Sequence, residues 1–296
     1  MKIRMRRYRH EDDYERVGQF LVRTYQATGN HINWLQPRWE YMHYHPLIRD
    51  VDLGPIGIWE AEDEIVGVVH PEHRMGTVYL EVDPAHAMLK GEMVEYAGKQ
   101  LAVVSEGVRA LRIFVDDSDS EFQQLAAGMG YEKTAGSEEM TRLTVPDPFP
   151  EITLPKGFHL KSLADDNDLW KVHTVLWRGF DHGDDPPDEE LDDRRFMQSA
   201  PNFRKDLNIV VEAPDGRFAA YCGMWYEPVH RVAYVEPVAT DPDFRRMGLG
   251  KAAVMEGVRR CGAEGATVAY VGMALPIYLS IGFKRMYKQS MWQRKW

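Results

Sequence analysis

The chain has 296 residues, and its 36 lysines and arginines against 46 aspartates and glutamates give a formal net charge of −10. This acidic balance argues against a general nucleic-acid-binding protein, which needs a basic surface against phosphate. Only two cysteines occur, which excludes a disulfide scaffold and favours a reducing, cytoplasmic setting. No apolar run reaches the ~18 residues of a membrane span, and acidic residues follow the basic start, so neither a membrane segment nor a signal peptide is predicted.

Three landmarks of the first half recur in the second half in the same order, at offsets of 152 to 158 residues. The matched pairs are residues 6–25 with 161–180, Val82-Asp83-Pro84 with Thr240-Asp241-Pro242, and Met129-Gly130-Tyr131 with Ile281-Gly282-Phe283. Turn signals such as Asp-Pro are common enough to explain one match, but three ordered matches favour a duplication.

A proline-rich segment separates the two halves. Four of the 17 prolines fall within residues 145–155. Proline lacks a backbone donor and disrupts helices, so this segment is predicted to be an extended linker. We therefore expect one domain over residues 1–150 and a second over residues 151–296.

Each half is predicted to be an α/β domain. In the second half, strands are expected over residues 158–163, 207–213, 218–225, 232–240, 266–271 and 283–292. Helices are expected from an Asp165 cap to about Phe180, from Leu249 to Cys261 before Gly262, and from Pro276 to Ile281 before Gly282. This order predicts a mixed, mostly antiparallel sheet with helices on both faces.

The segment that follows the first predicted helix of the second half is very acidic. Eight of the fourteen residues from Phe180 to Asp193 are Asp or Glu. The segment either attracts a cationic ligand or is a solvated loop and helix start, where acidic residues suit the helix dipole.

The strongest chemical signal lies between Val238 and Lys251. A β-branched strand ends, an arginine-rich turn follows, and Gly248 and Gly250 open a helix. The first turn of a helix presents unpaired N–H groups and the positive end of its dipole, and glycine lets an anion approach the backbone. The segment therefore predicts a phosphate or pyrophosphate site, with an Arg-rich helix entry that binds no ligand as the alternative.

Three anion-binding motifs compete for this segment. A Walker A loop needs Gly at position 245 and Ser or Thr at 252, where the chain has Arg245 and Ala252. A dinucleotide fingerprint needs an acidic residue about 20 residues further on, and none occurs from Gly265 to the end. The third motif, Arg/Gln-x-x-Gly-x-Gly/Ala, is met by Arg245, Gly248 and Gly250.

A second motif begins 28 residues beyond Gly250, where Tyr278 to Phe283 has the form Tyr-x-x-x-Gly-Phe. Together the two motifs resemble the GNAT superfamily of acyl-CoA-dependent N-acyltransferases, from about Phe158 to the last residue. The resemblance implies acetyl-CoA as cosubstrate, a small-molecule or peptide amine as acceptor and direct attack of that amine on the thioester. It implies no metal, nucleic-acid or membrane partner.

The resemblance also implies roles for individual residues. Tyr278 would protonate the departing thiolate, or else it is an aromatic on the packed face of a short helix. Glu236 is the candidate base for the amine, because Pro237 beside it suggests a bulge that re-aims side chains; a solvated strand carboxylate is the alternative. The residues expected to bind acetyl-CoA are Val238, Ala239, Thr240, Arg245, Arg246, Met247, Gly248, Leu249, Gly250 and Lys251.

The first half resembles the same fold without the motif. Alignment on the Asp-Pro pairs places Ala87, Lys90 and Glu92 where Arg245, Gly248 and Gly250 stand. A glutamate would repel a pyrophosphate, so this half is expected to be a degenerate copy that closes the acceptor pocket or forms a homodimer face. The competing function for the whole chain is a non-catalytic acyl-CoA-binding sensor or interaction module.

Overall fold

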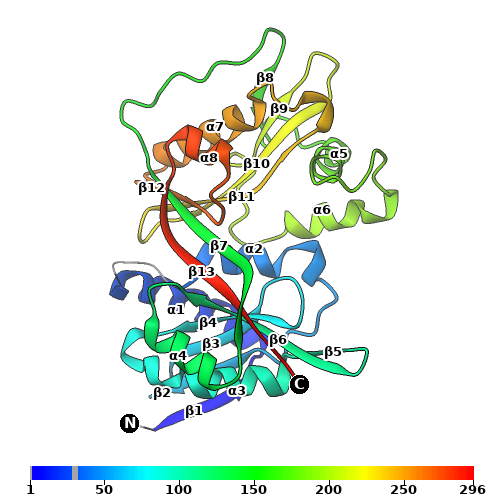
Figure 1. Ribbon diagram of the computed structural model, residues 1–296. Coiled ribbons are helices and arrows are strands. Elements are labelled where there is room, and N and C mark those ends of the chain that lie inside the picture. Colours follow the sequence, from blue (N-terminus) through cyan, green and yellow to red (C-terminus); the bar gives the residue numbers. More distant parts are fainter. Residues whose placement is uncertain (1, 29–32) are drawn as a thin grey trace. The chain divides into compact units, whose positions relative to one another are not determined.

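The computed structural model describes residues 2–28 and 33–296, which form two compact units (Figure 1). The first unit contains residues 1–43, 47–139 and 287–296, and the second contains residues 44–46 and 140–286. Within the described ranges, no helix combines the length and the apolar character that a bilayer span requires.

The sheet of the first unit follows the strand order β1-β2-β3-β4-β6-β13, with β5 paired to β6. Its strands are β1 (Ile3–Arg7), β2 (Gly57–Ala61), β3 (Glu64–Pro71), β4 (Thr77–Val82), β5 (Val103–Ser105), β6 (Val108–Asp116) and parts of β7 (Glu132–Thr144) and β13 (Lys284–Lys295). Its helices are α1 (His10–Thr28), α2 (Gln36–His43), α3 (Lys90–Gln100), α4 (Ser120–Gly128) and the 3-10 helix η2 (Pro84–Leu89), and the short η1 (Pro46–Ile48) starts in the second unit. Two apolar clusters fill this unit, around Trp59 and around Trp39.

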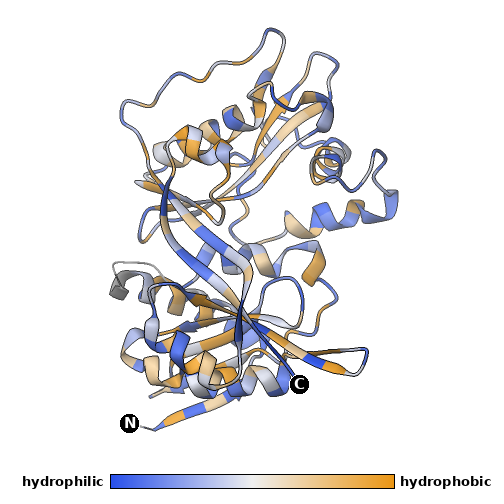
Figure 2. Ribbon diagram, viewed as in Figure 1, coloured by the Kyte–Doolittle hydropathy of each residue, from blue (hydrophilic) through white to orange (hydrophobic). Residues whose placement is uncertain are grey.

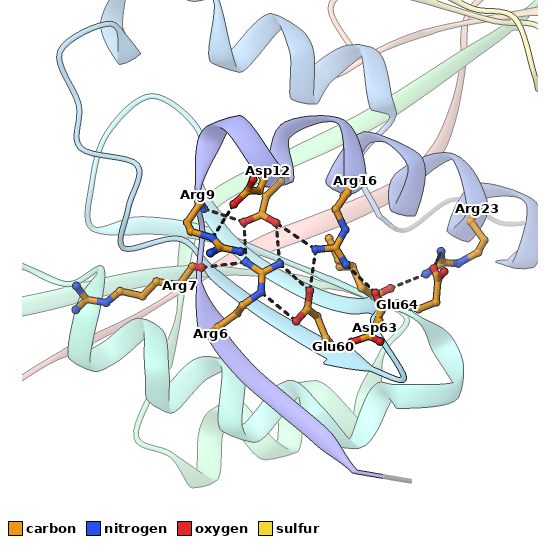
Figure 3. Close-up of polar contacts among 11 residues, drawn as sticks. Arg6, Arg7, Arg9, Asp12, Arg16, Arg23, Glu60, Asp63 and Glu64 are labelled. Atoms are coloured by element: carbon orange, nitrogen blue, oxygen red, sulfur yellow. Dashed lines mark hydrogen bonds and ion pairs between the residues drawn. The ribbon is translucent and has the colours of Figure 1, made fainter.

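A buried ion-pair cluster joins β1, α1 and β2 (Figure 3). The guanidinium of Arg6 lies 2.7 Å from Asp13 and 2.6 Å from Glu60, and Arg16 also reaches Glu60 at 2.8 Å. Hydrogen bonds from Arg6 lower the pKa of the Glu60 carboxyl below its ordinary value. Each carboxylate is therefore neutralised where the strand and helix meet, as buried charges require.

The sheet of the second unit follows the order β7-β12-β11-β10-β9-β8. Its other strands are β8 (His159–Ser162), β9 (Ile209–Glu212), β10 (Phe218–Glu227), β11 (Val232–Thr240) and β12 (Val268–Val271). Its helices are α5 (Leu169–Gly179), α6 (Leu191–Met197), α7 (Leu249–Ala263) and α8 (Pro276–Ile281), with 3-10 turns η3 (Asp188–Glu190) and η4 (Pro242–Phe244). Figure 2 shows β10 and β11 mostly in hydrophobic colours and α6 mostly hydrophilic, in line with a buried central sheet and a solvated acidic segment.

The last strand of each half pairs within the other unit. β7, which follows Gly130, pairs antiparallel with β12, with Leu143 opposite Ala269. β13, which follows Gly282, pairs antiparallel with β6, with Trp292 opposite Ile113. The compact units therefore do not coincide with residues 1–150 and 151–296, because β7 and β13 each begin in one unit and end in the other. The domain boundary itself stays a prediction.

The predicted fold class, two tandem α/β units with mixed, mostly antiparallel sheets, is confirmed. Two predicted helix ends were wrong. Asp168 caps α5 by accepting from the N–H groups of Trp170 and Lys171, while Asp165 closes a turn back to Ser162. Helix α7 continues through Gly262 to Ala263, because the left-handed turn occurs at Gly265, with φ +108°.

Candidate functional site

Strands β11 and β12 diverge halfway along β11. They pair in parallel only from Val232 opposite Val268 to Tyr234 opposite Tyr270. Beyond this point β11 keeps its partner β10 on one side, where Val238 lies opposite Cys222 and Thr240 opposite Ala220. The other edge of residues 235–240 has no strand partner among the described residues. An extended ligand can pair with such an open edge.

A bulge in β11 lies at the start of this open edge. Cys222 pairs with Val238 and Met224 pairs with Val235, so Glu236 and Pro237 together face Gly223. A Cβ on Gly223 would lie 2.4 Å from the carbonyl oxygen of Glu236, so only glycine fits there. The predicted bulge at Pro237 is thus confirmed, and the indole N–H of Trp225 donates to the Glu236 carbonyl at 2.9 Å.

The loop after β11 presents backbone amides. Asp241 caps η4 by accepting from the N–H of Asp243 at 2.9 Å, and Gly248, with φ +81°, precedes α7 without a side-chain cap. In the described part of the chain, the N–H groups of residues 246–248 donate to no protein acceptor. Residues 245–248 are exposed, and free amides before the first turn of a helix are the arrangement that the sequence predicted for an anion site. Binding of an anion there stays a prediction.

The side chains of this loop have structural partners. Arg245 donates to the carbonyl of Gly179 at 3.0 Å and to the Asp181 carboxylate at 2.8 Å, so it ties the loop to the end of α5. Lys251 donates to the Ser280 carbonyl at 3.2 Å. Two of the predicted binding residues, Arg245 and Lys251, therefore hold the loop in place through side-chain hydrogen bonds, while both remain partly exposed to solvent.

One glycine brings both sequence motifs together. A Cβ on Gly250 would lie 2.7 Å from Thr240 Oγ1 and 3.3 Å from Ile277 Cδ1. The start of α7 thus lies directly against the end of β11 and against α8, which carries Tyr278. The spacing in sequence alone did not place these three elements in contact.

Tyr278 is 6 % exposed and packs edge-on against Phe283, with ring centroids 5.9 Å apart. Burial raises the pKa of the Tyr278 phenol well above its ordinary value, and the nearby Cys222 and Glu236 raise it further. Tyr278 is therefore protonated at neutral pH, as a proton donor must be.

Two close contacts were not predicted from the sequence. The Arg178 guanidinium on α5 lies 2.8 Å from the Asp241 carboxylate, and this pairing raises the pKa of Arg178. At the adjacent Gly179, a Cβ would lie 2.7 Å from the Ala239 Cβ. The sequence shows an Arg-Gly pair at the predicted helix end, but the residues that this pair contacts, Asp241 and Ala239, lie about 60 residues further along the chain.

The matching loop of the first unit has a different backbone. Asp83 caps η2 as Asp241 caps η4, but η2 runs directly into α3, and the N–H of Lys90 donates to the carbonyl of Ala87. Glu92 accepts from the indole N–H of Trp59 at 2.9 Å. The first unit thus lacks the open amide loop of the second within its described residues.

The chain is similar to known acetyltransferases. Residues 169–283 match the family described as Acetyltransferase (GNAT) family. The chain is 26 % identical over 235 residues to a mycothiol acetyltransferase of Thermomonospora curvata, covering 74 % of this chain and 78 % of the relative. It is 27 % identical over 244 residues to a mycothiol acetyltransferase of Thermobispora bispora, covering 74 % and 79 %.

Two solved structures share the fold over nearly the whole chain. A GCN5-related N-acetyltransferase from Sphaerobacter thermophilus superposes with a TM-score of 0.69 at 14 % identity, covering 99 % of this chain and 95 % of the other. A tandem GNAT protein from the clavulanic acid biosynthesis pathway superposes with a TM-score of 0.65 at 15 % identity, covering 99 % and 98 %.

Proposed function

We propose that in this chain, which belongs to the GNAT family of acetyltransferases, the open edge of β11 and the loop before α7 bind acetyl-CoA. The chain transfers an acetyl group from acetyl-CoA to an amine, and is thus an enzyme rather than a binding module. The observation that carries the proposed site is the contact of Gly250 with Thr240 and Ile277, which joins the amide loop, the open strand edge and the helix of Tyr278.

The amides of residues 246–251 hold the diphosphate of acetyl-CoA in this proposal, because their N–H groups and the dipole of α7 favour negative charge. The pantetheine arm pairs with the backbone of Val238 to Thr240, which has no strand partner on that side among the described residues. A backbone N–H near Val238 polarises the thioester carbonyl.

The chemistry then needs two proton transfers. The neutral amine nitrogen attacks the carbonyl carbon, a C–N bond forms, and the C–S bond breaks. Glu236 accepts the proton that the amine loses, directly or through water, and the Tyr278 phenol donates a proton to the departing thiolate. The raised pKa of the buried phenol keeps it protonated at neutral pH, which this assignment requires.

We infer that the acceptor is a small-molecule amine. The first candidate to test is the amine that the mycothiol acetyltransferases, which this chain resembles, acetylate.

Both cysteines are free and buried, which supports the proposal of a reducing, cytoplasmic setting. The test is release of free CoA from acetyl-CoA with a panel containing that acceptor, a polyamine, an aminoglycoside, an amino acid and a peptide amine. Turnover with the acceptor of the mycothiol acetyltransferases supports the inference of a small-molecule amine, and turnover confined to the peptide amine overturns it.

A further inference from the structure

The first unit contains an open cleft where β4 and β6 diverge. These strands pair in parallel only from Thr77 opposite Arg112 to Val78 opposite Ile113, and then separate. The cleft beyond has a volume of about 660 Å³ including its mouth. Its walls are mainly apolar, from Leu80, Val82, Phe114 and Phe122. An apolar lining with a few polar side chains is typical of small-molecule sites.

One carboxylate oxygen in the lining of the cleft has no hydrogen-bond partner among the described residues. Asp116 lines the cleft and is only 5 % exposed. Its Oδ1 accepts from the backbone N–H of Ser118 at 2.7 Å, but its buried Oδ2 has no hydrogen-bond partner among the described residues. A buried carboxylate oxygen is costly to leave unpaired, so it favours a ligand that brings a hydrogen-bond donor.

Among the described residues that line the cleft, the one lysine is already neutralised. The ammonium of Lys90 forms an ion pair with Asp119 and lies 4.9 Å from the centroid of the Phe122 ring. The charge of Asp116 is therefore not balanced by a cation that lines the cleft, and the cleft favours a positive ligand.

A phosphate ligand does not fit this cleft. The turn that would hold it is folded into η2, where the N–H of His86 donates to the Asp83 carbonyl at 2.7 Å and the N–H of Lys90 donates to the Ala87 carbonyl. The open amide loop of the second unit has thus been replaced by a hydrogen-bonded turn beside two carboxylates.

We propose that the cleft of the first unit is a second ligand site, which binds a small organic ammonium ion with a short apolar body. The ammonium donates to Asp116, and the apolar body packs between Phe114 and Phe122. This site is separate from the acetyl-transfer site and does not depend on the assignment of that site.

Calorimetry on the full chain with three matched probes tests the proposal: 3-phenylpropylamine, 3-phenylpropan-1-ol and 3-phenylpropanoate. We expect the amine to bind at least tenfold more tightly than the alcohol, and the carboxylate to show no binding. Asp116→Asn keeps an acceptor for Ser118, and should weaken the amine at least tenfold while leaving the alcohol unchanged. Glu121→Gln, on the exposed side of α4, is the matched charge control and should change neither affinity.

A steric pair of variants locates the bound amine. Ala87 and Ala85 are both exposed on η2, but only Ala87 lines the cleft. Ala87→Phe should abolish amine binding and Ala85→Phe should not, while acetyl-CoA turnover stays unchanged in both. Equal affinity for the amine and the carboxylate, no binding by any probe, or amine binding that Asp116→Asn and Ala87→Phe leave intact would each overturn the proposal; the last outcome would place the amine at the acceptor site of the second unit.

Discussion

Arg178 and Asp241 form a largely buried ion pair, with Nε 2.8 Å from Oδ2 and with side-chain exposures of 14 % and 1 %. Arg178 lies in the last turn of helix α5, and Asp241 begins the loop that presents the amides before α7. The pair therefore fixes the loop from a remote part of the chain, and it links the stability of the second unit to its binding site.

Removing Asp241 tests this link. Asp241→Ala leaves Arg178 with only the more exposed Asp184 and Asp243 and removes the cap of η4. We expect a loss of about 2–4 kcal/mol in unfolding free energy and a KM for acetyl-CoA raised at least tenfold. Urea unfolding and steady-state kinetics measure the two effects. Asp215→Ala, which breaks an exposed pair with Arg217, is the control and should cost less than about 1 kcal/mol.

The role of Tyr278 can be separated from its packing. Tyr278→Phe keeps the ring against Phe283 but removes the proton donor, so kcat should fall by about 10²–10⁴-fold with little change in the KM for acetyl-CoA. Tyr226→Phe, which loses a hydrogen bond to the Glu264 carbonyl, should leave kcat unchanged. A loss of less than tenfold for Tyr278→Phe would argue that the ring only packs.

Glu236 is tested through the pH dependence of the reaction. Glu236→Gln should lower kcat/KM by at least tenfold near neutral pH, where an amine with a pKa of about 10.4 needs a base. The deficit should shrink as the pH approaches that value, because the amine then arrives without its proton. A deficit that is constant from pH 7 to pH 10 contradicts the assignment, and Glu212→Gln on β9 provides the control.

The close contact at Gly250 predicts a steric effect. Gly250→Ala places a methyl group 2.7 Å from Thr240 Oγ1, and should cost about 1–3 kcal/mol and raise the KM for acetyl-CoA. Adding Thr240→Ala should restore part of both losses, which a double-mutant cycle measures. Gly91→Ala in α3 meets only ordinary contacts at 3.8 Å and should be neutral or stabilising.

The cluster of Arg6 predicts acid sensitivity in the first unit. Because Arg6 lowers the pKa of Glu60 in the folded state, the stabilisation is complete above the unfolded pKa of about 4.3. It is lost as the pH falls through the lower folded value. Urea unfolding from pH 7 to pH 2.5 should show Glu60→Gln less stable by about 3–5 kcal/mol at pH 7, with a smaller difference at the acid end. A constant difference would contradict this account.

Most elements of the second unit follow from local sequence. The Pro276 start and Gly282 end of α8, the strand from Val232 to Thr240 and the bulge at Pro237 depend on backbone preferences of single residues, which act at short range. The same holds for the paired glycines before α7. The sequence therefore predicted the elements of the candidate site and its chemical class.

The tertiary structure alone decided how these elements meet. The exchange of β7 and β13 between units, the divergence of β11 from β12 and the pairing of Arg178 with Asp241 all depend on contacts between residues far apart in the chain. The cleft of the first unit arises in the same way, because β4 and β6 are separated in sequence by η2, α3 and β5, and they pair over two residues before they diverge. Local preferences determine which residues form a strand, but the partner of each strand edge is chosen by packing and hydrogen bonding over the whole fold.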